Sequence, residues 1–196
     1  MKLAIEKRLI EIGAFAQSDT YRQIYQNIID GIHTVSWADP REFVINPVPK
    51  ANGVLPIKNN FIAHLVRQGW ESEVSMSVIN GLNPGPIDAI FRSDKGIVAV
   101  EWETGNISSS HRALNKIALG IIQKQLIAGF LIIPMRSLSK YLTDRIGNYE
   151  ELSPYFQLYP KLTITEGVMG VLGVEHDRTS NKVLFIPKGK DGNAKK

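Results

Sequence analysis

A polar turn between two apolar runs is the feature that most constrains this fold. Ile87–Arg92 and Ile97–Glu103 are strand-like runs on either side of Ser93–Gly96, whose composition is typical of a β-hairpin turn. With a two-residue turn at the tip, the residue numbers of each cross-strand pair sum to 189. Asp88 is then predicted to lie opposite Glu101 near the open end of the hairpin.

The segments around the hairpin predict an α/β fold. Apolar periodicity predicts a helix over Ser109–Gln125, a continuous apolar strand over Phe130–Ile133 and a helix over Ser137–Ile146. Two further helical patterns, Leu3–Phe15 and Thr20–His33, open the chain. We therefore predict a mixed central β-sheet flanked by helices.

Composition limits the domain organisation and the possible chemistry. The 196 residues suit a single domain over 1–187, followed by a flexible basic tail, 188–196, that carries four lysines. The absence of cysteine excludes disulfides, thiol catalysis and cysteine-ligated metal. No apolar run approaches the roughly 20 residues of a membrane helix, so we expect a cytoplasmic protein with no membrane partner. The net charge of +4 favours a polyanionic partner but is too common to identify one.

Three carboxylates are predicted to meet at the end of the hairpin. Strand side chains alternate with period 2, so Glu101 and Glu103 project from the same face, which Asp88 shares. Clustered like charges need compensation, and one or two Mg²⁺ ions would supply it, because magnesium prefers hard oxygen ligands. The spacing alone equally allows a solvated strand face whose acids pair with lysines from elsewhere in the chain.

The residues around these acids resemble a known nuclease signature. Pro86-Ile87-Asp88 followed by Glu101-Trp102-Glu103 is similar to the PD-(D/E)xK pattern, with glutamate where lysine is common. That glutamate makes the segment resemble BamHI-type restriction endonucleases. The resemblance implies a PD-(D/E)xK core, Mg²⁺ bound by Asp88, Glu101 and the Trp102 carbonyl, and Glu103 as general base. Glu71 is the better placed of two upstream glutamates to act as a further catalytic acid.

The resemblance extends to residues that read DNA bases. It implies base contacts at five positions, of which Asp144 lies 41 residues after Glu103. The five are Asn106, Ser108, Arg112, Asp144 and Arg145. Arginine suits guanine, asparagine suits adenine and aspartate accepts from cytosine N4, so these residue types agree with a GGATCC site. Taken singly, each residue could instead be a helix cap or an exposed surface charge.

The function implied is a type II restriction endonuclease. Such an enzyme hydrolyses phosphodiester bonds in both strands of a palindromic site and leaves 5′-phosphates. Cutting both strands of a palindrome calls for a homodimer with two-fold symmetry. A bacterial host would also carry a cognate DNA methyltransferase, without physical contact to this chain. Two alternatives remain open: a structure-specific repair or nicking nuclease on the same fold, and a sequence-specific DNA-binding protein without catalysis.

Overall fold

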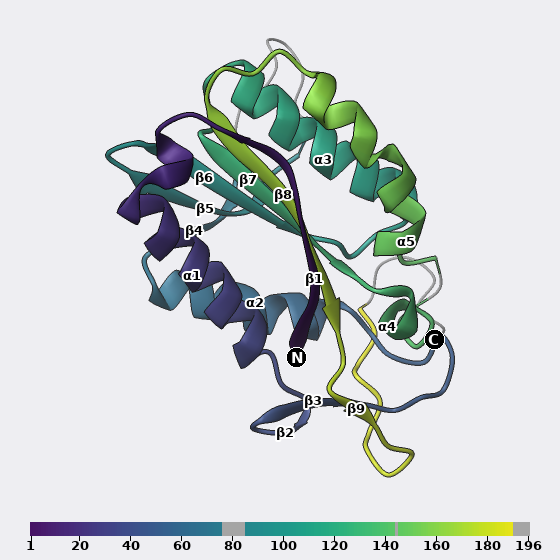
Figure 1. Cartoon of the computed structure of the whole chain (residues 1–196). Coiled ribbons are helices and arrows are strands. Elements are labelled where there is room, and N and C mark those ends of the chain that lie inside the picture. The colour runs from purple at the N-terminus through teal and green to yellow at the C-terminus, as the bar shows by residue number, and fades with distance from the viewer. Residues whose placement is uncertain (76–84, 144, 190–196) are drawn as a thin grey trace.

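Six strands form a mixed sheet in the order β1-β8-β7-β6-β5-β4 in the computed structural model, which describes residues 1–75, 85–143 and 145–189 (Figure 1). Strands β6, β7 and β8 run parallel to one another, and β1, β5 and β4 pair antiparallel with their neighbours. The bounds are β1 Lys2–Ile12, β4 Glu71–Val74, β5 Ile87–Ser93, β6 Gly96–Trp102, β7 Ala128–Pro134 and β8 Gly167–Glu175. This arrangement confirms the predicted mixed sheet.

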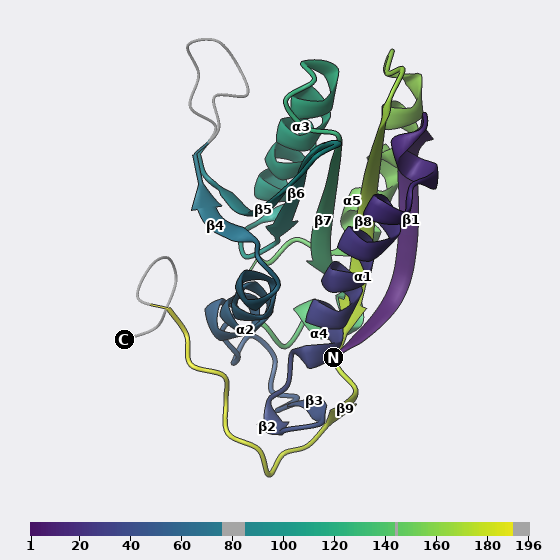
Figure 2. The same cartoon turned by 90° about the vertical axis from the view of Figure 1, so that its left-hand side faces the viewer.

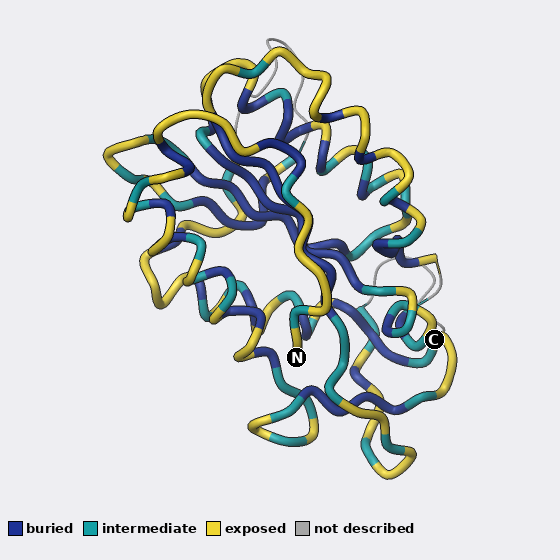
Figure 3. The backbone as a smooth tube through the Cα atoms, viewed as in Figure 1, coloured by how far each residue is buried: buried dark blue, intermediate teal, exposed yellow. Residues whose placement is uncertain are grey.

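Helices cover both faces of the sheet (Figures 1 and 2). One face packs against α1 (Asp19–Thr34), α2 (Leu55–Arg67) and the short α4 (Arg136–Ser139). The other packs against α3 (Ile107–Ile122), α5 (Tyr149–Leu152) and the 3₁₀ helix η2 (Ser153–Lys161). The central strands are therefore buried along most of their length (Figure 3).

Smaller elements complete the described fold. A 3₁₀ turn, η1 (Phe15–Gln17), precedes α1, and a three-stranded sheet joins β2 (Ala38–Asp39), β3 (Glu42–Ile45) and β9 (Arg178–Thr179). Within the described residues, no helix combines the length and apolar character that a membrane crossing requires. Residues 190–196 of the predicted flexible tail lie outside the described part of the chain.

The predicted hairpin and its register are confirmed. Strands β5 and β6 pair from Ala89 opposite Val100 to Ser93 opposite Gly96, and these partners follow the predicted sum of 189. Asp94 and Lys95 form the two-residue tip, and the Ser93 hydroxyl donates a hydrogen bond to the Gly96 carbonyl at 2.8 Å. The continuation of this register carries Asp88 and Glu101 to the open end of the ribbon.

The helix predicted over Leu3–Phe15 is wrong, because this segment is mainly strand β1. It forms the edge of the sheet and pairs antiparallel with β8, with register irregularities between Leu3 and Ile5 and between Arg8 and Ile10. Interruptions of this kind disturb the simple alternation by which a strand is recognised in sequence. The backbone hydrogen bonds that make this segment a strand are formed with β8, far along the chain. The local pattern of apolar residues therefore does not reveal them.

The helix predicted over Ser137–Ile146 is also largely wrong. Among the described residues of this range, only those of α4, which ends at Ser139, are helical, and the chain beyond it bonds to the segment 50–52. Arg145 has a φ of 69°, which no α-helix accommodates. The other two helices are confirmed with shifted ends, as α1 and as α3, which begins at Ile107 rather than Ser109.

Candidate active site

Asp88 and Glu101 lie together at the open end of the β5–β6 ribbon. The Asp88 N–H donates to Glu101 Oε2 at 3.4 Å, and the Trp102 N–H donates to Asp88 Oδ2 at 2.8 Å. Both acids are buried, with relative exposures of 8% and 7%, while Trp102 packs into the core with Val98 and Val100. The hairpin register thus brings two carboxylates together at one point, as predicted.

Two lysines compensate the charge of these acids. Lys58 of α2 lies with its Nζ 2.5 Å from Asp88 Oδ1 and 3.3 Å from Glu73 Oε1. Lys116 of α3 forms an ion pair with Glu101, and its Nζ also donates to the Pro86 carbonyl at 2.9 Å. The pairing of acids with distant lysines, which the sequence left open, is therefore present.

Glu103 is the third member of the cluster and is held in a defined orientation. Its Oε1 accepts from the Gly105 N–H at 2.5 Å, and its Oε2 accepts from the Ser110 hydroxyl. Burial raises the pKa of Glu103 to about 7 and, despite the nearby Lys116, also raises the pKa of Glu101 to about 7. Both carboxyls thus titrate close to neutral pH in the protein without metal.

The N-terminus of α3 stands directly beside the carboxylates. Asn106 caps the helix by accepting from the Ser109 N–H at 3.2 Å, and it is exposed together with Ser108 and Arg112. Arg112 lines a cavity of about 250 Å³ whose walls also contain the three acids. Of the first three predicted base-contact residues, Arg112 therefore lines the carboxylate cavity, while Asn106 and Ser108 are exposed at the same start of α3.

The segment that carries Arg145 reaches the same helix end. The Gly147 N–H donates to the Gly105 carbonyl at 2.9 Å, which ties the chain just after Arg145 to the turn that starts α3. Arg145 is exposed. Asp144, the other predicted base contact in this segment, lies outside the described residues.

Glu71 does not join the cluster. It lies on β4, where its carboxylate pairs with Arg92 at 2.8 Å on the surface. Glu73, the other upstream glutamate, contacts Lys58 and through it Asp88. The sequence analysis favoured Glu71 over Glu73, but in this structure Glu73 is the upstream glutamate that neighbours the site.

Sequence reasoning missed three partners of the acids. Lys58 comes from a separate helix, and nothing in its sequence surroundings marks it. Lys116 could have been found, because one face of α3 follows the helical spacing i, i+3, i+4, i+7 and lines the cavity. The residues on that face are Ser109, Arg112, Ala113 and Lys116.

The donor set fits a hard divalent cation. Among the described residues, no three acidic or histidine side chains are gathered as a complete set of metal ligands. The site offers instead two buried carboxylates next to the Trp102 main chain. Magnesium is usually held by one or two carboxylates while waters and substrate phosphate complete its shell, so this incomplete set suits it.

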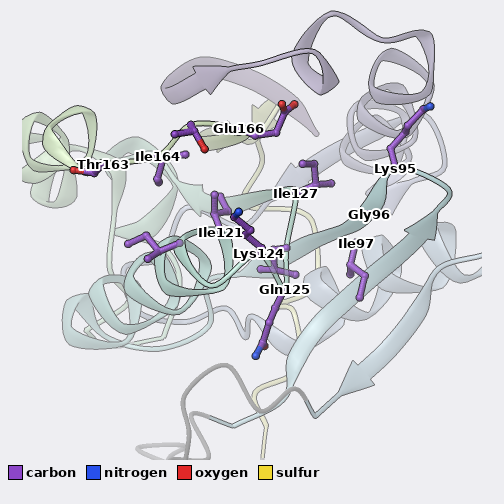
Figure 4. A pocket seen from close by; sticks show the side chains of 13 residues that line it. Lys95, Gly96, Ile97, Ile121, Lys124, Gln125, Ile127, Thr163, Ile164 and Glu166 are labelled. Carbon is purple, nitrogen blue, oxygen red and sulfur yellow. The ribbon is translucent and has the colours of Figure 1, made fainter.

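A second cavity lies at the opposite ends of the parallel strands. It has a volume of about 520 Å³ and is lined by the beginning of β6, the end of α3 and the loops that lead into β7 and β8 (Figure 4). Its charged residues are Lys95, Lys124 and Glu166. None of the predicted site residues lines it, so size does not identify the functional cavity here.

Comparison with known proteins identifies the family. The model of the family described as "Restriction endonuclease BamHI" matches residues 1–193. The chain belongs to the BamHI restriction endonuclease family. It is 45% identical over 172 residues to the type II restriction enzyme OkrAI of Oceanobacter kriegii, covering 87% of this chain and 89% of that enzyme. It is also 34% identical to the type II restriction enzyme BamHI of Bacillus amyloliquefaciens, covering 99% of this chain and 94% of that enzyme.

Solved structures confirm the predicted restriction-endonuclease-like fold. The structure of BglII in complex with a DNA 16-mer aligns with a TM-score of 0.66 at 11% identity, covering 90% of this chain and 79% of BglII. Free BglII aligns with a TM-score of 0.53 at 12% identity, covering 90% and 81%. The family match and the two named relatives show that the chain is an enzyme of the type II site-specific deoxyribonuclease class.

The raised pKa of Glu103 predicts how pH affects stability. Below about pH 4.5 the carboxyl is protonated in both states; between there and about pH 7 the folded protein holds a proton that the unfolded chain releases. In EDTA and without DNA, the wild type should therefore lose stability relative to Glu103→Gln as pH rises from about 5 to about 8, by roughly 2–3 kcal/mol. Urea unfolding at the two pH values measures this difference.

The control for this experiment is Glu71→Gln, which neutralises an exposed glutamate. It should keep the pH dependence of the wild type. Parallel pH profiles for the wild type and Glu103→Gln would contradict the assignment of the raised pKa to Glu103.

Proposed function

We propose that this chain is a homodimer that cuts both strands of double-stranded DNA at GGATCC, with Mg²⁺ as cofactor, and leaves 5′-phosphates. The proposal treats residues 1–187 as one catalytic domain acting in the bacterial cytoplasm, in a host with a cognate DNA methyltransferase. One observation carries it: the buried Asp88, Glu101 and Glu103 adjoin the helix end where Asn106 and Arg112 are exposed. The residues proposed for catalysis and those proposed for base reading thus lie next to each other at the start of α3.

Asp88 and Glu101, with the Trp102 carbonyl, would hold the metal. When bound, a divalent cation polarises the scissile phosphate and lowers the pKa of a nearby water. Lys58 and Lys116 keep the two carboxylates in place by ion pairing in the protein without metal. They also supply positive charge next to the position that the phosphate backbone would take.

Glu103 would accept the proton of the attacking water. The Gly105 N–H and the Ser110 hydroxyl hold its two oxygens, so its orientation is set before DNA binds. A pKa of about 7 places this carboxyl near the working pH, where a general base is most effective. The metal site and the base are joined by a single residue, Trp102.

Base reading would come from the exposed residues around the start of α3. Arg112 and Arg145 can each bond guanine O6 and N7, Asn106 and Ser108 suit the A·T pair, and Asp144 suits cytosine N4. The free N–H groups at the start of α3 add a positive pole beside these residues. Each bidentate contact would discriminate by about 1–3 kcal/mol, so several together could exclude single-base variants.

An apolar surface on the α3 side of the sheet supports the dimer. Exposed apolar side chains gather on α3 and η2, which lie side by side (Figure 1) and are joined by a hydrogen bond from the Tyr159 hydroxyl to Asn115 Oδ1. They are Ile122, Tyr155, Leu158 and Leu162. Two copies related by the symmetry axis of a palindrome would bury these residues against each other.

Plasmid digestion tests the proposed function. With Mg²⁺, DNA that carries one GGATCC site should become linear and carry 5′-phosphates, while a plasmid with a one-base variant stays uncut. EDTA should abolish cutting. Nicked circles as the final product would favour a nicking nuclease, and specific binding without cutting under any metal condition would favour a non-catalytic DNA-binding protein.

Glu103→Ala tests the assignment of the base. The variant should bind the GGATCC duplex with nearly the affinity of the wild type but cleave it at least about a hundredfold more slowly, within the range of one general base. Gel shifts in Ca²⁺ and single-turnover cleavage in Mg²⁺ separate binding from chemistry. Cleavage at a near-normal rate would refute the role of Glu103.

Leu158→Lys tests the proposed dimer surface. Leu158 is 60% exposed on η2, so a charge there should leave the fold intact and prevent burial of the surface in a dimer. Sedimentation should then show a monomer and double-strand cutting should fall. The matched control, Val66→Lys on α2, is similarly apolar and 47% exposed and should remain dimeric. A dimer in the Leu158 variant would contradict this surface.

A further inference from the structure

Asn52 connects three segments that are far apart in the sequence. It is fully buried, and its side-chain amide donates to the Asn46 carbonyl at 2.9 Å and to the Tyr141 carbonyl at 3.0 Å. Its Oδ1 accepts from the Ile186 N–H at 3.2 Å. Each polar atom of the side chain therefore has a main-chain partner.

The main chain around Asn52 pairs with the segment that leads to Arg145. The Asn52 N–H donates to the same Tyr141 carbonyl at 3.0 Å, and the Lys50 N–H donates to the Lys140 carbonyl at 3.0 Å. Asn52 and Leu142 form an isolated parallel bridge. The Tyr141 carbonyl thus accepts two bonds from one residue, which fixes the path of the chain four residues before Arg145.

The chain on the far side of Arg145 is fixed as well. Gly147 bonds the Gly105 carbonyl, and a Cβ added at Gly147 would lie 2.5 Å from Ser110 Oγ. Between these two attachments, Arg145 has a left-handed φ of 69°. A non-glycine residue holds this conformation only when its surroundings determine it, so the attachments on both sides decide where Arg145 points.

The end of the described chain fixes the orientation of the Asn52 amide. The coil that follows β9 passes below α2 (Figure 2), and the Ile186 carbonyl accepts from the Gly53 N–H at 2.8 Å. Because the Ile186 N–H can bond only the amide oxygen, the amide nitrogen must face Tyr141. A Cβ at Gly53 would lie 1.9 Å from the Pro187 carbonyl oxygen, so this contact is close.

We propose that Asn52 is a positioning residue for sequence discrimination. Held by Ile186, it sets the main chain of the segment that carries Arg145 and thereby directs Arg145 toward its base pair. The inference rests on the proposed base contact of Arg145. Its substrate is the same palindromic duplex, and it assigns to a residue outside the carboxylate site a share in choosing the sequence.

Discrimination is the readout that separates positioning from simple structural support. Asn52→Ala should reduce the ratio of kcat/KM for GGATCC over variants changed at the guanine read by Arg145 by at least about tenfold, within the range that one bidentate base contact supplies. Asn52→Ser, which keeps a hydroxyl, should show a smaller reduction. Thermal melts of both variants are recorded under the assay conditions.

Asn46→Ala is the matched control. Asn46 is also buried, and its amide donates to the Val183 carbonyl at 2.8 Å, but among the described residues its side chain makes no hydrogen bond to the segment before Arg145. This variant should lower the melting temperature while leaving the discrimination ratio unchanged.

The outcomes separate this inference from the proposed function. Unchanged discrimination in folded Asn52 variants overturns the positioning role, as does an equal loss in Asn46→Ala. Unfolding of both Asn52 variants would make the residue purely structural and also overturn it. Arg145→Ala is measured alongside: if it keeps full discrimination, the base contact itself is refuted, whatever the Asn52 variants do.

Discussion

Burial of opposite charges at the end of one β-ribbon is the constraint on which the site depends. Asp88 and Glu101 lose most of their hydration, and Lys58 and Lys116 reach them from helices on the two opposite faces of the sheet. Removing one member of a buried pair typically costs about 3–5 kcal/mol, because the partner is left uncompensated. The cluster therefore links both helical layers to the sheet and ties the geometry of the site to the packing of the whole fold.

The same cluster is continuous with the surface that would read bases. Glu103 bonds Gly105 and Ser110, Asn106 caps α3, and Gly147 bonds Gly105. The Glu103 carboxylate, the start of α3 and the segment after Arg145 are thus all attached to the short turn at Gly105 and Asn106. The proposed base, Glu103, is bonded to the Gly105 N–H, and the segment proposed to read bases is bonded to the Gly105 carbonyl, so the position of one bears on the orientation of the other.

The segment proposed to read bases likewise depends on residues that are distant in the chain. Its path is fixed by Asn52 before Arg145 and by Gly105 after it, and Asn52 is itself oriented by Ile186. Local propensity predicted a continuing helix there and was wrong, because main-chain bonds to residues 50–52 outweigh it. Loops that carry specific contacts often depend on such support, since they have no regular hydrogen-bonding pattern of their own.

By itself, the sequence determined the hairpin register, the position of Asp88 next to Glu101 at the open end of the hairpin, the helix that follows and the resemblance to BamHI-type enzymes. These depend on short-range patterns: a two-residue turn, alternation along strands and ordered motif positions. Only the tertiary structure decided that β1 is a strand, that Lys58 and Lys116 neutralise the acids, and that Glu73 rather than Glu71 neighbours them. Those features arise from contacts between residues distant in the chain, whose free energy no local pattern records.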